Sequence, residues 1–294
     1  MRLFNNYLSS FAVLTMILMG ASALAQQKIA EGEYAIQDGS LQKVATRWIL
    51  YAGKSGGYEL KSEIQNLPPD ILLTQVQTLN EALIPTSIGY QLDVKGTAKA
   101  AVSITCDFPE NTIVCRGQSR NGPLSISKPY KYQGSFWLIL EGLSALDMPW
   151  LLDGALNRAI AQNASLKFST ITVSGGGASL LGAIVDEAKL RAVNPGATLT
   201  VPSVGNDAEW SINSDAEQNE FKLAGTEIMK VNQQQISTRH YVLTGQDEPM
   251  HLWIAGPGVL LRINDVVLTN YKQYRKLIPD LKIDTPAGTQ PAQK

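Results

Sequence analysis

Apolar and polar residues alternate along most of the chain, as they do in β-strands that bury one face. In the stretch 42–52, for example, Val44, Thr46, Trp48 and Leu50 fall on one side. Gly, Pro, Asn and Asp interrupt these runs at short intervals, which favours tight turns between neighbouring strands. The pattern predicts a meander with strands at 31–37, 42–52, 58–65, 71–79, 87–94, 100–106, 112–117, 124–127 and 166–173. Further strands are predicted at 198–202, 208–212, 220–231, 235–244, 250–255, 259–264 and 266–274.

The stretch 134–162 is the most apolar part of the chain after its N-terminus, and it departs from simple alternation. Residues 135–141 can form a buried strand. A helix is expected from Asp147, because Asp is a favoured N-cap and Pro149 falls in the first turn. A second helix is predicted over 178–193. At 100° per residue, one face of the first helix collects Met148, Leu151, Leu152, Ala155, Leu156 and Ala159.

These elements together predict an α+β fold. We expect a long, curved antiparallel β-sheet, a half-barrel-like meander, with one or two helices packed on its concave face. The sheet and a helical insert around 142–193 are expected to form a single domain over 26–284. The tail 285–294 has nothing to bury and is expected to be disordered.

The first 25 residues have the three parts of a secretory signal peptide. Arg2 supplies a short positive region, residues 11–19 are apolar, and Ala23-Leu24-Ala25 is a cleavage site before Gln26. The apolar run is shorter than the roughly 20 residues that a membrane span needs. No later stretch is long and apolar enough to span a bilayer. We therefore expect cleavage near Ala25 and Gln26, and export of a protein that does not span the membrane, to the periplasm or beyond.

Charge excludes one broad class of partner. The chain carries 25 Lys and Arg against 26 Asp and Glu, for a formal net charge of −1, and no run of like charges. Nucleic-acid binding needs clustered Lys and Arg on one face. We therefore expect no nucleic-acid partner.

The two cysteines, Cys106 and Cys115, are expected to form a disulfide. Export would place them where disulfides persist. A hairpin centred on Glu110 and Asn111 would set the two residues directly opposite each other, which is close enough for the bond. A reactive pair is the weaker reading, because the spacing is not Cys-x-x-Cys.

Candidate catalytic groups are few. His240 and His251 lie in strand patterns with no nucleophile motif near them, and a solvated strand face is the preferred position for both. The glycines at 175–177 could cradle a phosphate, but the dinucleotide and P-loop fingerprints are absent, and a flexible turn is preferred. Asp186 and Glu187 are adjacent and would not face each other on a helix. We expect no metal site and no cofactor.

The two ends of the chain resemble a group of bacterial exported proteins. The stretch 32–64, GEYAIQDGSLQKVATRWILYAGKSGGYELKSEI, is similar to their opening hairpins, and 250–264, MHLWIAGPGVLLRIN, to their closing hairpin. These are exported domains of unknown function and proteins of the glycolipid-binding type. The resemblance implies a curved antiparallel sheet wrapped around a helix, similar to the half-barrels of lipoprotein carriers. It brings no catalytic residue with it.

The preferred function is non-enzymatic binding of an apolar or amphipathic ligand, such as a lipid or glycolipid, in a groove between sheet and helix. One alternative is a structural or interaction protein of the cell envelope with a solid core. A second alternative is a hydrolase whose site the sequence does not reveal. The tryptophans are expected to fill the core, and the alternative is that some of them line the groove. The candidate groove walls are Trp137, Trp150, Leu151, Leu152 and Leu156.

Overall fold

The computed structural model describes residues 26–38, 41–53, 56–65, 71–81, 85–94, 102–109, 112–119, 122–129, 135–140, 166–174, 211–244, 249–256 and 258–282. In this part of the chain all regular structure is β. The first eight strands are β1 (Lys28–Asp38), β2 (Leu41–Ala52), β3 (Tyr58–Ile64), β4 (Ile71–Leu79), β5 (Pro85–Val94), β6 (Val102–Asp107), β7 (Thr112–Ser119) and β8 (Gly122–Pro129). The others are β9 (Ser135–Leu140), β10 (Leu166–Ser174), β11 (Ser211–Val231), β12 (Gln234–Thr244), β13 (Met250–Ala255), β14 (Val259–Ile263) and β15 (Val266–Gln273).

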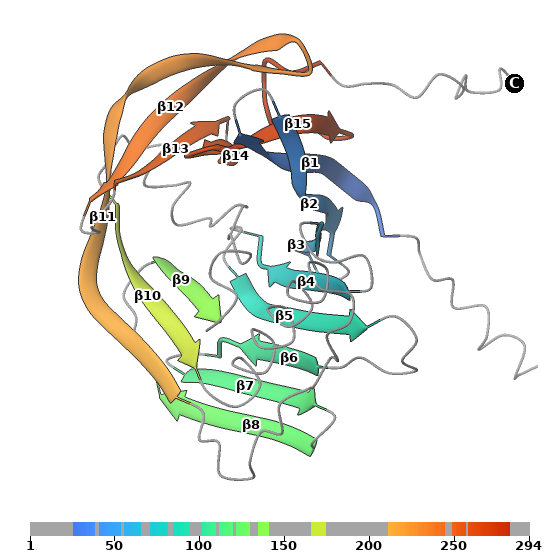
Figure 1. The fold of residues 1–294 in the computed structure, drawn as a ribbon, viewed down its shortest axis with the longest axis vertical. Helices are drawn as coiled ribbons and strands as arrows, with labels where there is room; N and C mark the ends of the chain where they lie inside the picture. Colours follow the sequence, from blue (N-terminus) through green and yellow to red (C-terminus); the bar gives the residue numbers. More distant parts are fainter. Residues whose placement is uncertain are drawn as a thin grey trace, which may run out of the picture.

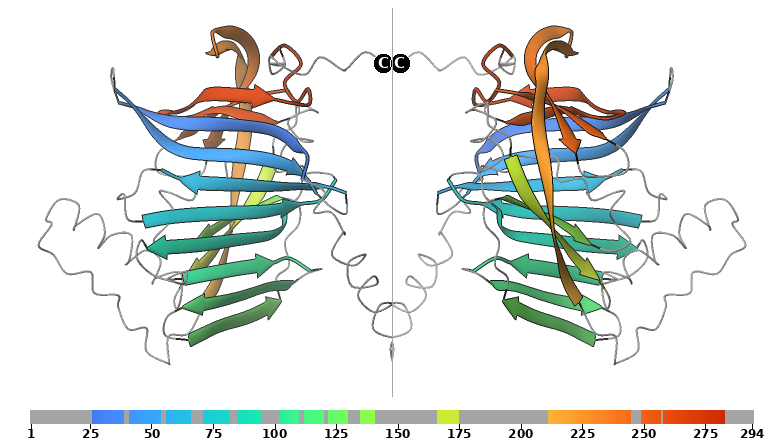
Figure 2. Two further views of the ribbon diagram at one scale, coloured as in Figure 1. Left: turned by 90° about the vertical axis from the view of Figure 1, so that its right-hand side faces the viewer. Right: turned by 90° about the vertical axis from the view of Figure 1, so that its left-hand side faces the viewer.

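All of these strands belong to one sheet. Its order is β8-β7-β6-β5-β4-β3-β2-β1-β15-β14-β13-β12-β11-β10-β9, so the chain forms two meanders that join where β1 pairs with β15. Neighbouring strands are antiparallel except β9 and β10, which are parallel. Figure 1 shows the sheet bending round, with β11 running along the left side from the level of β8 up to β12. In Figure 2 the strands from β15 and β1 to β8 lie one below another, and β11 runs across their direction.

The predicted α+β class is wrong, because the described chain is all-β and contains no helix. A curved sheet can bury its inner face against its own far arm, so a helix is not needed to cover it. One apolar cluster shows this, since it joins Trp48 and Leu60 of the first meander to Tyr241, Leu252 and other residues of the second. The helices predicted over 147–161 and 178–193 lie outside the described residues, as do the predicted signal peptide at 1–25 and the predicted tail from 285.

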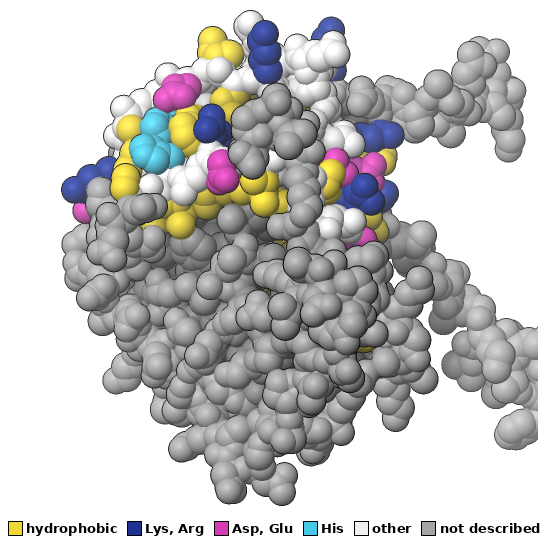
Figure 3. Space-filling view, in the orientation of Figure 1, with side chains coloured by type: hydrophobic (Ala, Val, Ile, Leu, Met, Phe, Trp, Pro, Cys, Tyr) yellow, Lys and Arg dark blue, Asp and Glu magenta, His cyan; other side chains and the backbone are white. Residues whose placement is uncertain are grey.

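Where the side chains are described, most strands have a buried and an exposed side, because successive side chains point to opposite faces. We call the buried side the inner face. In the first meander it carries Leu50, Leu60, Leu73 and Leu92, and in the second Tyr241, Leu243, Leu252, Ile254 and Ile263. The other side is the outer face. Both histidines of the chain lie at the surface over β12 and β13, on the outer face (Figure 3).

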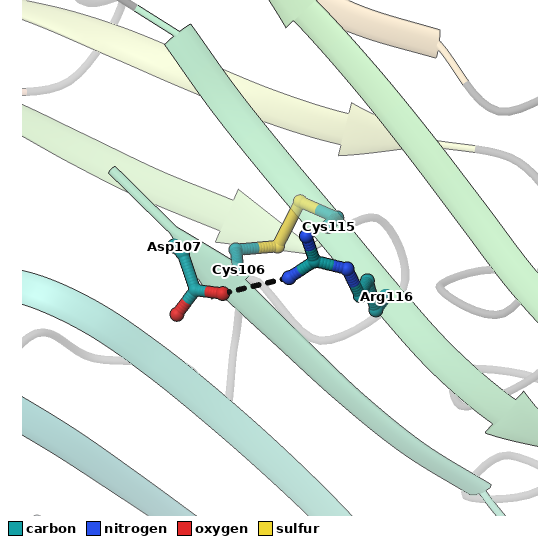
Figure 4. The surroundings of a disulfide bond; sticks show 4 residues. All are labelled: Cys106, Asp107, Cys115 and Arg116. Atoms are coloured by element: carbon teal, nitrogen blue, oxygen red, sulfur yellow. Dashed lines mark hydrogen bonds and ion pairs between the residues drawn. A yellow bond between two sulfur atoms is a disulfide. The ribbon is translucent and has the colours of Figure 1, made fainter. Parts of the chain in front are cut away.

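The disulfide predicted between Cys106 and Cys115 is confirmed. The two residues face each other across β6 and β7, and their Cα atoms are 4.0 Å apart. Beside the disulfide, Arg116 Nη1 lies 3.2 Å from Asp107 Oδ2 (Figure 4). Both cysteines are buried on the inner face. The bond therefore links two strands near one edge of the sheet.

Candidate binding site on the inner face of the sheet

A row of side chains crosses the inner face from β1 to β5. Paired positions in neighbouring strands place Gly32 opposite Trp48, Trp48 opposite Ser62, Ser62 opposite Gln75, and Gln75 opposite Tyr90. Directly opposite residues of an antiparallel pair point to the same face. The five positions therefore form one continuous line, which we call the inner row.

Trp48 is held at one end of the inner row by a glycine and two tyrosines. Its indole covers Gly32, where a Cβ atom would come within 2.6 Å of Trp48 Cζ2. The rings of Tyr34 and Tyr271 lie 6.4 and 5.9 Å from the Trp48 ring, centre to centre. Tyr34 is itself fixed, because its hydroxyl donates a 2.7 Å hydrogen bond to the Leu260 carbonyl. Trp48 thus sits where the two meanders meet.

Two polar atoms of the inner row have no hydrogen-bond partner. These are the indole Nε1 of Trp48 and the hydroxyl of Ser62, in residues that are 2 % and 1 % exposed. A buried donor without a partner costs about 1–3 kcal/mol, so such atoms are rare in folded proteins and point to a missing partner. The two residues are directly opposite each other on β2 and β3. One polar group lying over β2 and β3 on the inner face could form hydrogen bonds with both Trp48 Nε1 and the Ser62 hydroxyl.

The rest of the row is polar and connected. Gln75 Nε2 donates to the Tyr90 hydroxyl at 2.8 Å, and Gln77 Nε2 donates to Gln75 Oε1 at 3.2 Å. All three side chains are buried. Buried amides of this kind need partners, because they lose their water on folding. Ser62 therefore lies beside a hydrogen-bonded polar chain.

Apolar side chains border this polar row on both sides. The pairs one step along the strands include Leu50 with Leu60 and Leu73 with Leu92. Ile88 faces Gln77. A few polar groups set in an apolar surface are the usual composition of a small-molecule site. Chemically, the inner face offers apolar contacts and hydrogen-bonding atoms side by side.

The outer face of β15, β1, β2 and β3 has a different character. A depression of about 470 Å³ lies there, and half of the residues that line it are charged: Glu31, Glu33, Glu63, Arg47, Lys61 and Lys272. Arg47 pairs with Glu33 within the lining at 2.9 Å, whereas Lys61 and Glu31 pair with Glu59 and Lys28 outside it, at 3.0 and 2.7 Å. Three acidic and three basic side chains leave the lining without net charge, and the inner row is the stronger candidate site because of its two unpaired polar atoms.

Glu31 at the border of this depression is stabilised as a carboxylate. Burial by itself raises its pKa, but hydrogen bonds from Lys28 and Tyr274 lower it, and the pKa lies below its ordinary value of 4.5. The Tyr274 hydroxyl is 2.7 Å from Glu31 Oε1. In return, the bond to Glu31 raises the pKa of Tyr274. The three residues form a small network that ties the end of β15 to β1.

The candidate groove walls from the sequence are not tested by the structure. Trp137 lies on β9, where its backbone pairs with Thr170, but its side chain is outside the described part. Trp150, Leu151, Leu152 and Leu156 lie wholly outside the described residues. All five stay predictions.

The inner row was missed because its members look ordinary in the sequence. Ser62 and Gln75 of the row, and Gln77 beside it, are polar residues in strands, a type that is usually exposed to solvent. One signal was present: Ser62 stands on the same side of its strand as Leu60 and Ile64. A polar residue in register with buried apolar ones is a candidate for an interior polar contact.

Comparison with known proteins does not assign the chain to a family. No protein-family model matches the chain, and no curated protein matches its sequence. Among solved structures it is similar to a β-barrel-like protein of the domain of unknown function DUF1849 from Brucella abortus, at 8 % sequence identity and a TM-score of 0.41, covering 85 % of this chain and 100 % of that one. The likeness to lipoprotein carriers stays a prediction.

Proposed function

We propose that this chain is an exported, non-enzymatic binding protein for an amphipathic ligand of the lipid or glycolipid class. The ligand lies along the inner face of the sheet. Its apolar part contacts the leucines and isoleucines beside the inner row, and its polar group bonds to Trp48 and Ser62. No helix in the described part of the chain is long and apolar enough to cross a membrane.

One observation carries the proposal: the unpaired Trp48 Nε1 and Ser62 hydroxyl in a buried apolar surface. The indole can only donate, whereas the hydroxyl can donate and accept. A carbonyl, carboxylate or sugar hydroxyl oxygen between them would satisfy the indole and the hydroxyl together. An ordinary core offers no reason to keep two such groups opposite each other, because an apolar pair would be more stable.

Export is supported by two features of the chain. The first 25 residues have the composition of a signal peptide. The Cys106–Cys115 disulfide is of a kind that persists outside the reducing cytoplasm. β8 and β9 form the two edges of the sheet, so the sheet does not close by hydrogen bonds into a barrel in the described chain. We expect a ligand to reach the inner face between the two edge strands, β8 and β9.

Lipid binding by the purified exported protein tests the proposal. Native mass spectrometry should find a bound lipid, and a fluorescent fatty acid should bind with a saturable signal. Trp48→Phe keeps the ring but removes the donor, and Ser62→Ala removes the hydroxyl. Each should weaken binding of the probe about 3- to 10-fold, the loss expected for one hydrogen bond. Trp253→Phe, the same change on the outer face, should leave the affinity unchanged.

Two results would overturn the proposal. One is a parent protein that carries no lipid and shows no saturable probe binding. The other is probe binding that Trp48→Phe and Ser62→Ala leave unchanged. The first result would favour a solid-cored envelope protein that meets a protein partner through an outer face or edge.

A further inference from the structure

Polar and aromatic side chains from four strands gather on the outer face of the second meander. Glu227 comes from β11, His240 from β12, His251 and Trp253 from β13, and Arg262 from β14. His240 is directly opposite Trp253, and Trp253 is directly opposite Arg262. These five residues, which we call the histidine cluster, lie on the outer face, because Trp253 alternates along β13 with the buried Leu252 and Ile254.

The two histidines of the cluster meet nitrogen to nitrogen. His240 Nε2 is 2.9 Å from His251 Nδ1. On its other side, His240 Nδ1 is 2.9 Å from Glu227 Oε1. The second oxygen of Glu227 accepts a 2.7 Å hydrogen bond from the Trp253 indole. The carboxylate is therefore anchored, and it in turn sets the orientation of His240.

When neither imidazole carries a charge, these contacts determine which ring nitrogens carry a hydrogen. An ionised carboxylate only accepts, so His240 Nδ1 must carry the hydrogen that faces Glu227. His240 Nε2 is then the free lone pair, and His251 Nδ1 donates to it. If His251 instead carries its hydrogen on Nε2, then His240 Nε2 and His251 Nδ1 both have a free lone pair, and both can bind a metal ion. This change of tautomer leaves the number of protons on the two histidines unchanged.

We propose that His240 and His251 form a binding site for a divalent transition-metal ion of the copper or zinc type. The metal would be held by His240 Nε2 and His251 Nδ1. Glu227 would not touch the metal but would accept a hydrogen bond from the other ring nitrogen of His240, Nδ1. A carboxylate on the far nitrogen of a metal-binding histidine is the usual arrangement, because it fixes the ring and raises its basicity. Imidazole ligands favour Cu²⁺, Zn²⁺ and Ni²⁺ over Ca²⁺ and Mg²⁺.

Metal binding requires the two rings to separate and turn. Metal–nitrogen bonds of about 2.0–2.1 Å at a tetrahedral angle place two ligand nitrogens roughly 3.3 Å apart, about 0.4 Å more than the present 2.9 Å. The ring centres are 5.1 Å apart, so the two nitrogens now face each other almost in line, and both rings must turn for their lone pairs to converge on one ion. No group of three or more metal-binding side chains is found within the described ranges. The remaining coordination positions would be filled by water or by an external ligand.

Trp253 and Arg262 support the site from the side. The Trp253 ring is stacked on His240 with centres 4.3 Å apart and planes 6° from parallel. Arg262, from the strand on the other side of β13, lies over the Trp253 ring at 4.7 Å. The stack holds the His240 ring in place and puts an indole next to the proposed metal.

Titration with Cu²⁺ and Zn²⁺ of the full-length exported protein, without a histidine tag, tests the proposal. Calorimetry should show one saturable site. His240→Ala and His251→Ala should each weaken it at least 10-fold, and Glu227→Gln should weaken it about 10- to 100-fold. Zn²⁺ should raise the melting temperature of the parent protein and leave that of the double histidine variant unchanged. Ca²⁺ should not bind at this site.

The fluorescence of Trp253 supplies a second readout. Trp253 stacks on His240, so Cu²⁺ at the site should quench part of the tryptophan emission, and the double histidine variant should lose that part of the quenching. The proposal is overturned if the parent shows no saturable site for either ion below about 1 mM. It is also overturned if the double histidine variant binds both ions as tightly as the parent.

Discussion

The indole of Trp48 lies against the backbone of Gly32, so closely that residue 32 has no room for a side chain. A Cβ atom there would be within 2.6–2.8 Å of three atoms of the indole. The two residues are paired across β2 and β1, and β1 is the strand that joins the two meanders. Because Gly32 on β1 has no side chain, the Trp48 indole on β2 can lie directly against it.

Gly32→Ala should destabilise the protein by roughly 1–3 kcal/mol, because the added methyl group forces the indole or the strand to shift. Urea unfolding at neutral pH measures this change. Gly89→Ala is the matched control on β5, where the nearest atom to a new Cβ, Thr105 Oγ1, is at an ordinary 3.4 Å. It should be neutral or slightly stabilising. Equal effects of the two substitutions would contradict the close contact at Gly32.

Ser62→Ala should stabilise the ligand-free protein by about 1 kcal/mol, because it removes a buried hydroxyl that has no partner. Thermal or urea unfolding of delipidated protein gives the value. Ser103→Ala on β6, where the serine is only half-buried, should change stability by less than about 0.5 kcal/mol. A clear loss of stability in Ser62→Ala would mean that the hydroxyl has a partner in solution.

Replacement of both Cys106 and Cys115 by alanine should cost about 2–3 kcal/mol. The loop between them is short, with a sequence separation of 9, and the loss of loop-closure entropy grows with loop length. Unfolding of the variant and of the parent under the same conditions measures the cost. A thiol assay on denatured, unreduced parent protein should find no free thiol. Two free thiols would contradict the bond.

Gln273→Leu should destabilise the protein by roughly 2–5 kcal/mol, since it leaves several buried backbone groups unpaired. The fully buried Gln273 amide donates to the carbonyls of Ile278 and Leu281, and its oxygen accepts from the Leu277 and Ile278 amides. Hydrogen exchange of residues 277–281 should accelerate together with the loss of stability. Gln234→Ala removes one exposed bond, to Lys282, and should cost under about 1 kcal/mol.

Glu31→Gln should be less stable than the parent at pH 7, by about 0.5–1 kcal/mol for a partly exposed pair. The pKa of Glu31 is lowered in the folded state, so its contribution is present above its ordinary pKa of 4.5 and is lost as the pH falls through the folded value. The difference between parent and variant should therefore shrink in acid. Tyr274→Phe removes only one of the two donors to Glu31 and should show the same trend with a smaller amplitude. A difference that does not depend on pH would contradict the network.

Local alternation predicted much of the sheet. The predicted strands at 42–52, 71–79 and 250–255 agree closely with β2, β4 and β13. The hairpin that closes the disulfide was also predictable, because it depends on a turn and on facing positions only a few residues away. These features follow from the two-residue repeat of a strand and from local turn residues, which a sequence displays directly.

What the sequence determined by itself was therefore the strands, their buried sides and the disulfide between neighbours. The tertiary structure decided the pairing of β1 with β15, the all-β class of the described chain, and the single long strand β11 over Ser211–Val231. It also decided that Trp48 meets Gly32, and that Glu227, His240 and His251 meet on three strands. Such contacts depend on strand register and on the bend of the whole sheet. Register is set by packing between residues far apart in the chain, and no local pattern encodes it.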